Sequence, residues 1–311
     1  MSSIGTPAPH GDPRGAVTGS SVVSTGRGTR ARDVARALVS TRTGVVGTVL
    51  VGLMVIGALA AWFGLTPYDP IEQRPVDRLK VPSGSFWLGT DIFGRDVLSR
   101  SIAGAASSIR VAVVAVGISA AIGTFLGLVS GYARSSAVRA PVLGVTNILF
   151  AFPPLLLALA LASAFTRTWF TVAVAIAIVY IPIFVRVVRG PVLTLRETDF
   201  VRAAETVGMS PSRILLREIL PNLLPVIIVQ VTLSLSWAVL TEASLSFLGL
   251  GTPPPAPSLG SMVYEARVLV TTAWWTMVGP GVLLVLLVVG LNLLGDALRD
   301  VLDPRRTGRS M

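Results

Sequence analysis

Six long apolar segments constrain the fold of this 311-residue chain more than any other feature of its sequence. Each has about the 20 residues that a helix needs to cross the apolar core of a bilayer. With 52% hydrophobic and only 14% charged residues, the composition also fits an integral membrane protein. The sequence therefore predicts an all-α, polytopic membrane protein with six transmembrane helices. We expect these helices at residues 44–65, 109–132, 142–165, 169–188, 224–249 and 276–294.

Two of these segments contain proline. The third carries Pro153 and Pro154, and the fourth carries Pro182. A proline inside a helix lacks the backbone N–H and clashes with the preceding turn, so it bends or breaks the helix. We therefore expect kinks at these two places.

The basic residues are distributed unevenly between the two sides of the predicted bundle. Of the 26 lysines and arginines, 18 lie on the side of the N-terminus and seven on the opposite side, while Arg110 lies inside the second span. Because cytoplasmic loops are enriched in Lys and Arg, both termini are expected in the cytoplasm. Residues 1–40 then form a disordered cytoplasmic tail, residues 66–106 an extracytoplasmic loop and residues 297–311 a second cytoplasmic tail. The net charge of +10 thus reflects topology, and no concentrated patch indicates nucleic-acid binding.

The supply of reactive side chains limits the chemistry that this chain can perform. It has no cysteine, His10 is its only histidine and Lys80 is its only lysine. A phosphate-binding loop that ends in Gly-Lys-Ser/Thr is therefore impossible. No set of side chains offers a metal site, or a nucleophile with its base, so we expect no catalytic residue, metal or cofactor on this chain.

A polar, basic segment at residues 189–225 separates the fourth and fifth spans. Residues 199–207 are good helix formers, and Gly208 suits the left-handed turn that ends a helix. The segment therefore predicts a helix and a sharp break, followed by a second helix.

The second helix has its own start and stop signals. Ser210 is placed to cap its N-terminus, with Pro211 at the first helical position. Pro221 and Pro225 are expected to limit this helix before the fifth span begins. We expect a short helical hairpin at the membrane surface.

Small residues occur at regular positions in this hairpin. The first helix contains Ala203-Ala204, with Gly208 four residues on, and the second ends in Leu220-Pro221. This spacing resembles the EAA loop of ABC-importer permeases, in which the loop's helix sits in a groove of the cytoplasmic ATPase and passes its movement into the membrane. The resemblance implies an ATPase-coupling role for Phe200, Arg202, Ala203, Ala204, Glu205, Gly208, Ser210, Leu220 and Pro221.

Two residues depart from that family pattern. Arg202 stands where the family usually has Glu, and Glu218 stands where peptide permeases often have His. Both departures lie in the segment to which the resemblance assigns ATPase docking, and the sequence does not decide whether they alter it. The alternative interpretation is an ordinary interfacial hairpin without a docking role.

The loop after the first span contains WLGTD-x-x-GRDVLSR, from residue 87 to residue 100. It is similar to the segment after the first span in the C-type permease subunit of dipeptide and oligopeptide ABC importers. Charges of both signs alternate in it, which favours a self-satisfied salt-bridge cluster that holds the loop against the bundle; direct contact with the solute is the alternative. The motif residues are Gly89, Thr90, Asp91, Gly94, Arg95, Asp96 and Arg100.

The third part of the resemblance lies at residues 240–251, followed by a proline-rich segment and Gly260. It is similar to the segment that closes the fifth span in the same family, with Leu259 where Trp is usual. Together the three parts extend over residues 44–303.

Glu242 is an ionisable residue inside this predicted span. Such a group is costly in a membrane and usually faces protein or a water-filled cavity. It could line the translocation path or gate together with Ser244 and Ser246. Alternatively, it hydrogen-bonds to nearby Ser or Thr hydroxyls, pairs with Arg110 or contacts a partner subunit.

The resemblance also implies an assembly in a bacterial-type cytoplasmic membrane. A five-helix permease core at residues 107–296 would include a coupling loop at residues 189–222. The chain would pair with a second permease subunit as a heterodimer, with two ABC ATPase subunits or domains and an extracytoplasmic solute-binding protein. ATP and Mg would be bound by the ATPase subunits and not by this chain.

The resemblance implies that the chain forms the membrane pathway for di- or oligopeptides. A permease for nickel or another small solute is the alternative within transport. The coupling hairpin argues against an ion channel or a membrane scaffold, and the lack of cysteine and of a usable histidine argues against an intramembrane hydrolase.

Overall fold

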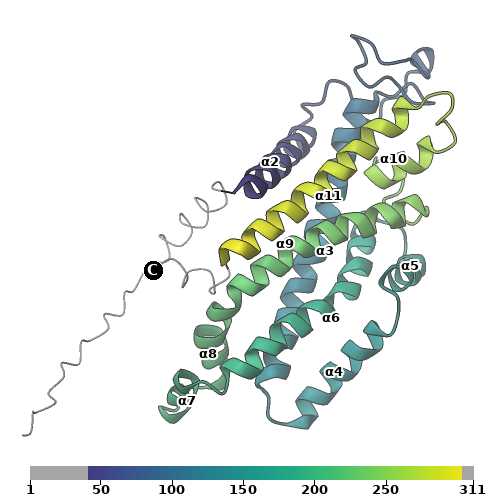
Figure 1. The fold of residues 1–311 in the computed structure, drawn as a ribbon. Helices are drawn as coiled ribbons and strands as arrows, with labels where there is room; N and C mark the ends of the chain where they lie inside the picture. Colours follow the sequence, from purple (N-terminus) through teal and green to yellow (C-terminus); the bar gives the residue numbers. More distant parts are fainter. Residues whose placement is uncertain (1–40, 303–311) are drawn as a thin grey trace, which may run out of the picture.

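The computed structural model describes residues 41–302; the tail predicted at residues 1–40, and residues 303–311 of the second predicted tail, lie outside this range. The described residues are mainly helical, apart from the outer loop at residues 63–96, and contain no β-strand beyond an isolated bridge between Thr90 and Asp96. Five helices are long and apolar enough to cross a membrane, and a bent pair makes a sixth if it counts as one span. The five are α2 (Arg42–Trp62), α3 (Val97–Tyr132), α6 (Trp169–Leu195), the continuous run that ends in α9 (Leu220–Phe247), and α11 (Trp275–Leu302). In Figure 1, α11 lies between α2 and α9, while α3 contacts both α6 and α9.

The third predicted span is broken in two. It consists of α4 (Ser136–Phe150) and α5 (Pro154–Ala164), whose axes differ by 97°. The break lies at Pro153 and Pro154, which confirms the kink predicted there, because Pro154 can begin a helix but cannot continue one. At Pro182, in contrast, α6 continues without interruption.

Close packing of α3 on α6 forms the centre of the bundle. A Cβ atom built on Gly123 would lie 2.5 Å from the Cβ of Phe184, and one on Gly127 would lie 2.8 Å from the Cβ of Val188. Only residues without a side chain allow the two backbones to approach this closely. Gly123 and Gly127 therefore serve helix packing, and α3 and α6 form one tightly packed pair.

Several helices extend beyond their apolar segments. The second helix begins at Val97, so residues 97–106, which we placed in the outer loop, are helical. Asp96 explains this start, because its carboxylate accepts a hydrogen bond from the backbone N–H of Ser99 at 2.7 Å and caps the helix. Helices α6 and α11 likewise run past their predicted ends, to Leu195 and Leu302. Hydropathy marks the apolar part of a helix, whereas backbone hydrogen bonding continues to the next stop signal.

The predicted second helix of the hairpin does not stop at the prolines. Helix α8 (Pro211–Ile214) continues through a π-helical turn, η2 (Leu215–Ile219), into α9 without a break. Pro221 lies in the first turn after the wider π turn, where its missing N–H is tolerated, and Pro225 lies inside α9. The expectation that Pro221 and Pro225 would limit a separate helix is therefore wrong.

One short helix was not predicted. Helix α10 (Leu259–Ala266) packs against α9 and α11 near the outer loop. Ser258 and Ser261 form a reciprocal capping box at its start. This pair, three residues apart, was the signal in the sequence that could have revealed the helix.

Candidate functional sites

Helix α7 (Asp199–Thr206) is attached to the bundle by both apolar and polar contacts. Val201 is fully buried in a small core that includes Ile214, and Ala204 and Leu220 pack against it. On the polar side, the Tyr132 hydroxyl at the end of α3 donates to Glu205 at 2.7 Å. Helix α7 therefore hydrogen-bonds to α3 and packs against α8 and the start of α9.

The remaining surface of α7 faces away from the chain. Phe200 is 42% exposed, and Val207, just after the helix, is 84% exposed. Ala203 is also exposed, so this face combines apolar groups with a small residue. An apolar surface on a short helix at the end of the bundle is a feature of interaction sites.

Gly208 makes the turn between α7 and α8 with φ +80°, which confirms the left-handed turn predicted there. No atom lies within 4 Å of a Cβ built at this position, so the backbone conformation alone requires glycine. Ser210 occupies the N-cap position of α8, but its side chain makes no capping hydrogen bond. The predicted capping role of the Ser210 side chain is therefore wrong; its backbone carbonyl accepts from Arg213 and Ile214 instead.

Arg202, one of the two departures from the family pattern, forms an exposed ion pair. Its guanidinium lies 3.2 Å from Glu197, which Arg196 also contacts at 3.1 Å. Hydrogen bonds from Arg202, and then from Arg196, hold the pKa of the Glu197 carboxyl below its ordinary value. The carboxylate therefore stays charged at neutral pH, although an exposed pair of this kind contributes little to stability.

Glu242 lies fully buried where α9 meets α3. Its two carboxyl oxygens accept hydrogen bonds from the hydroxyls of Ser108, at 2.7 Å, and Ser246, at 2.6 Å. Of the alternatives that the sequence left open for Glu242, the contacts with hydroxyl groups are the ones present. Arg110 does not join them, because its guanidinium lies over the ring of Trp169, 4.3 Å from the ring centroid.

Ser244 points away from this buried group. Its hydroxyl donates to the carbonyl of Leu240, and the residue lines a groove on another face of α9. The structure therefore brings Glu242 and Ser246 together and leaves Ser244 apart from them.

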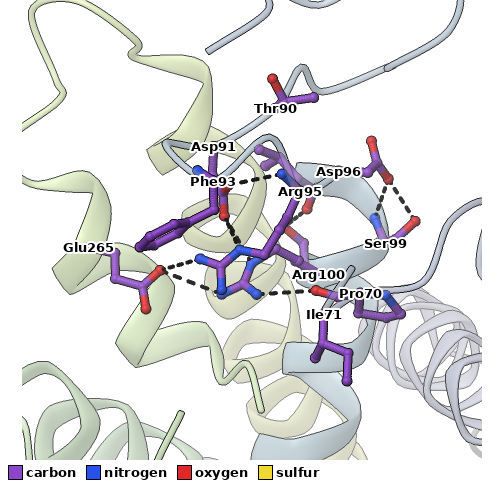
Figure 2. A network of polar contacts seen from close by, with 12 residues as sticks. Pro70, Ile71, Thr90, Asp91, Phe93, Arg95, Asp96, Ser99, Arg100 and Glu265 are labelled. Carbon is purple, nitrogen blue, oxygen red and sulfur yellow. Dashed lines mark hydrogen bonds and ion pairs between the residues drawn. The ribbon is translucent and has the colours of Figure 1, made fainter. Parts of the chain in front are cut away.

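Three charged residues of the outer-loop motif, Asp91, Arg95 and Arg100, form an ion-pair cluster with Glu265 from α10. Figure 2 shows the guanidinium groups of Arg95 and Arg100 between the carboxylates of Asp91 and Glu265. Arg95 contacts Asp91 at 2.6 Å and Glu265 at 3.3 Å. Arg100 contacts the same two carboxylates at 3.4 and 3.5 Å. The cluster holds two positive and two negative charges, which confirms a salt-bridge cluster, but Glu265 supplies the second carboxylate while Asp96 caps α3.

Arg100 also donates to the backbone carbonyl of Pro70 at 3.1 Å, so the cluster connects α3, the loop and α10. Glu265 was not predicted from the sequence, because no local pattern links it to Arg95, 170 residues earlier. Its position on a short capped helix was the only signal available.

The neutral residues of the motif shape the loop around this cluster. Gly89 and Gly94 both have positive φ, and a Cβ atom on Gly89 would lie 2.6 Å from the carbonyl oxygen of Lys80. Thr90 is fully buried; its hydroxyl accepts from the N–H of Lys80, and its carbonyl accepts from the indole of Trp275 at 3.2 Å. The outer loop is thus packed against the start of α11. Within residues 41–302, no group of three or more His, Cys, Asp or Glu side chains could hold a metal ion.

Known permease proteins are similar to this chain over most of its length. It is 39% identical over 274 residues to the dipeptide transport system permease protein DppC of Alkalihalophilus pseudofirmus, covering 88% of this chain and 90% of that protein. It is 40% identical over 269 residues to the probable D,D-dipeptide transport system permease protein DdpC of Escherichia coli K12, covering 86% and 89%. It is 42% identical over 257 residues to the glutathione transport system permease protein GsiD of another Escherichia coli strain, covering 82% and 84%.

The fold also matches a solved transporter. A chain of the MetNI methionine ABC transporter, in an inward facing conformation, superposes with a TM-score of 0.54 at 22% identity, covering 64% of this chain and 94% of that chain. Residues 123–308 match the model of a family of inner membrane components, and the apolar helices of this chain indicate a multi-pass membrane protein. The chain belongs to the family of binding-protein-dependent transport system inner membrane components.

Proposed function

We propose that this chain is a permease subunit of an ABC importer and forms the membrane pathway for dipeptides or short oligopeptides. The observation that carries this proposal is the 39–42% identity, over most of both chains, to permeases named for dipeptides, D,D-dipeptides and glutathione. These are all short peptides or peptide derivatives. A permease for nickel or another small solute is the second candidate, since it would share the same architecture.

The proposed assembly contains a second permease chain, two ATPase subunits or domains and an extracytoplasmic solute-binding protein. Because Lys80 is the only lysine and lies in the outer loop, this chain cannot form a phosphate-binding loop. ATP and Mg would therefore be bound by the ATPase subunits, and the chain by itself would not be an enzyme. The excess of basic residues on one side supports a bacterial cytoplasmic-membrane location with both termini in the cytoplasm.

Helix α7 is the proposed contact with the ATPase. Its exposed face carries Phe200 and Ala203, and Val207 follows it, while Val201 and Glu205 fasten its other side to the bundle. Because α7 is exposed on one face and packed against the bundle on the other, a movement of the bound ATPase can displace α7 and, through it, the helices that it contacts. ATP-driven movement of the ATPases would thus reach α3 and the α8–α9 run, and the pathway would alternate its access.

The experiment that tests this function is uptake by the reconstituted complex. The chain is co-expressed with its partner subunits, placed in liposomes with ATP inside, and supplied outside with the binding protein and a radiolabelled dipeptide. We expect ATP-dependent dipeptide uptake, and none when the phosphate-loop lysine of the partner ATPase is replaced. The purified chain alone should hydrolyse no ATP.

The same liposomes separate the two candidate solutes. Uptake of radioactive nickel, without uptake of any dipeptide, would contradict the peptide assignment and support the second candidate. ATP hydrolysis by the purified chain, after contaminants have been excluded, would contradict the assignment of ATP to the partner subunits.

A further inference from the structure

A groove of about 560 Å³ opens between α5, α6 and α9. Helix α9 provides most of its lining, and Tyr180 faces the groove from α6. The volume lies within the ~300–1,000 Å³ that is typical of sites for small molecules. The groove residues with hydrogen-bonding side chains or a large aromatic ring are Tyr180, Gln230, Ser234, Trp237, Thr241 and Ser244.

The contributions of α9 to this groove form a single stripe. Residues 230, 234, 237, 241 and 244 follow one another at intervals of four, three, four and three, which places them on one face of an α-helix. Trp237, in the middle of the stripe, is 60% exposed. On the other side of the helix, Thr232 and Val239 are buried in the bundle. Gln230, Thr241 and Ser244 are half-buried and Ser234 is buried, so the part of this stripe that the rest of the chain leaves most open is centred on Trp237.

Polar side chains along this face keep hydrogen-bonding capacity beyond the bonds that they make within the chain. Gln230 donates to Ser234 at 3.0 Å, and the hydroxyls of Tyr180 and Thr241 lie 3.1 Å apart. A glutamine side chain has two N–H donors and a carbonyl acceptor, of which this bond uses only one donor. Side chains with hydrogen-bonding capacity to spare inside a membrane span usually face water, a solute or another protein.

The groove is also neutral. Among the described residues that line it, none carries a formal charge. A groove of this kind offers hydrogen bonds to peptide N–H and C=O groups and an indole surface to apolar side chains, but no ionic partner. Its chemistry fits a solute that is recognised by its amide backbone.

We propose that this stripe of α9 lines the solute pathway, and that short peptides in transit contact it through neutral hydrogen bonds and the Trp237 ring, without selection by side-chain charge. The proposal rests on the proposed function and deepens it, because it assigns the pathway surface to named residues. It also moves the pathway from the buried Glu242 and Ser246 to the opposite side of the helix, where only Ser244 of the three expected residues lies.

Because the chain has no cysteine, a single introduced cysteine can be labelled specifically, and this allows a direct test of the proposal. Single variants Ser244→Cys and Trp237→Cys are assembled with the partner subunits and treated with a membrane-impermeant methanethiosulfonate reagent. Ser236→Cys is the matched control, because Ser236 lies on the same helix but is buried and directed toward the carbonyl of Val288 on α11. Labelling is read on this chain after the subunits have been separated.

We expect the water-soluble reagent to modify the cysteines at positions 237 and 244 but not the one at position 236. Loaded binding protein with ATP should change the labelling rates at the two groove positions. Labelling only by a lipid-soluble maleimide would identify a lipid-facing surface and overturn the proposal. Resistance to both reagents, together with cross-linking to the second permease, would identify a subunit interface and also overturn it.

A charge reversal tests the neutral character of the groove. Ser244→Asp and Ser244→Lys are compared for uptake of alanyl-glutamate and alanyl-lysine with the binding protein saturated. Relative to the unaltered chain, we expect the anionic-to-cationic uptake ratio to fall with Asp and to rise with Lys, each by about two- to fivefold. Unchanged ratios in both variants would overturn the proposal; if a charged variant fails to assemble, the labelling decides alone.

Failure of this proposal can be distinguished from failure of the proposed function. If the unaltered complex transports no dipeptide, the peptide assignment fails while aqueous labelling of the groove is still measured. If the complex transports dipeptides and the groove cysteines resist the aqueous reagent, the function stands and the assignment of this surface fails.

Discussion

The hydroxyl group of Tyr132 donates a hydrogen bond to Glu205 across 2.7 Å, and this bond joins the last residue of α3 to α7. A second bond acts alongside it, because Arg196 donates to the carbonyl of Gly131 at 3.0 Å. Since α3 packs directly on α6 through its glycines, a force applied to α7 acts on both helices together. The Tyr132–Glu205 contact is thus placed to transmit movement into the bundle.

Removing the Tyr132–Glu205 bond should weaken the coupling of ATP hydrolysis to uptake more than it lowers the stability of the fold. A net hydrogen bond contributes about 0.5–1.5 kcal/mol, so we expect Tyr132→Phe, which removes the donor, to lower uptake about two- to tenfold. Glu205→Gln keeps a neutral amide oxygen that can accept the bond, so it should lower uptake less. ATP hydrolysis should fall less than uptake, because the catalytic sites lie on other chains. Both rates are measured in proteoliposomes of equal subunit content.

Thr206→Ala is the control for this prediction, because the Thr206 hydroxyl donates only to the carbonyl of Arg202 within the same helix. It should leave the ratio of uptake to ATP hydrolysis unchanged. An unaltered ratio in both Tyr132→Phe and Glu205→Gln would show that the contact carries no coupling.

Substitutions of Gly208 should act through the backbone. Its φ of +80° costs other residues about 1–2 kcal/mol, and no neighbouring atom would clash with a new Cβ. A carboxylate at this position would also meet the negative end of α7, at a cost of about 0.3–1 kcal/mol. We expect Gly208→Asp to lower uptake about ten- to a hundredfold while the protein still inserts, because insertion depends on the apolar spans.

Gly208→Asn separates the two effects, since asparagine has the same shape as aspartate, tolerates positive φ and carries no charge. It should retain more uptake than Gly208→Asp at equal membrane levels, as judged by immunoblotting. Normal uptake by the Asp variant would argue against a coupling role for this turn. Loss of the variant from the membrane would identify Gly208 as a folding residue instead.

One basic and one acidic member of the outer cluster, Arg100 and Glu265, should have different effects on stability when they are replaced. Arg100 is only 2% exposed, so Arg100→Met leaves the carboxylate of Asp91 with one arginine in a buried site. Breaking a buried ion pair from one side costs about 3–5 kcal/mol. Glu265 has a 39% exposed side chain, so Glu265→Gln should cost less than about 1 kcal/mol.

Thermal unfolding of the purified chain in detergent measures both changes. The melting temperature should fall clearly for Arg100→Met and only slightly for Glu265→Gln. Glu72→Gln serves as a control, because the Glu72–Arg74 pair is exposed. A melting temperature for Arg100→Met equal to that of the unaltered chain would contradict the structural role of the cluster.

The orientation in the membrane is testable with reporter fusions. A reporter that is active only in the cytoplasm should be active when fused after Arg306 and inactive when fused at Ser83. The reason is the excess of basic residues in the segments on the side of the termini. Activity of the reporter only at Ser83 would reverse the topology.

Features that depend on neighbouring residues were predictable from the sequence. The apolar segments located the long helices, Pro153 and Pro154 predicted the break in the third span, and Gly208 predicted a left-handed turn. Each depends on hydropathy or on backbone sterics within a few residues, which a sequence contains directly. Local signals failed where two of them competed, as at Pro221, where the π turn lets the helix continue.

Contacts between distant segments depended on the tertiary structure. Glu265 joins Arg95 across 170 residues, and Ser108 meets Glu242 across 134, only because packing brings α10 and α9 against α3. The same packing decides which face of α9 is buried with Glu242 and which face, carrying Trp237, lines the open groove. The apolar periodicity of a helix that is hydrophobic on nearly all sides does not define its rotation, so only the contacts made by its neighbours could do so.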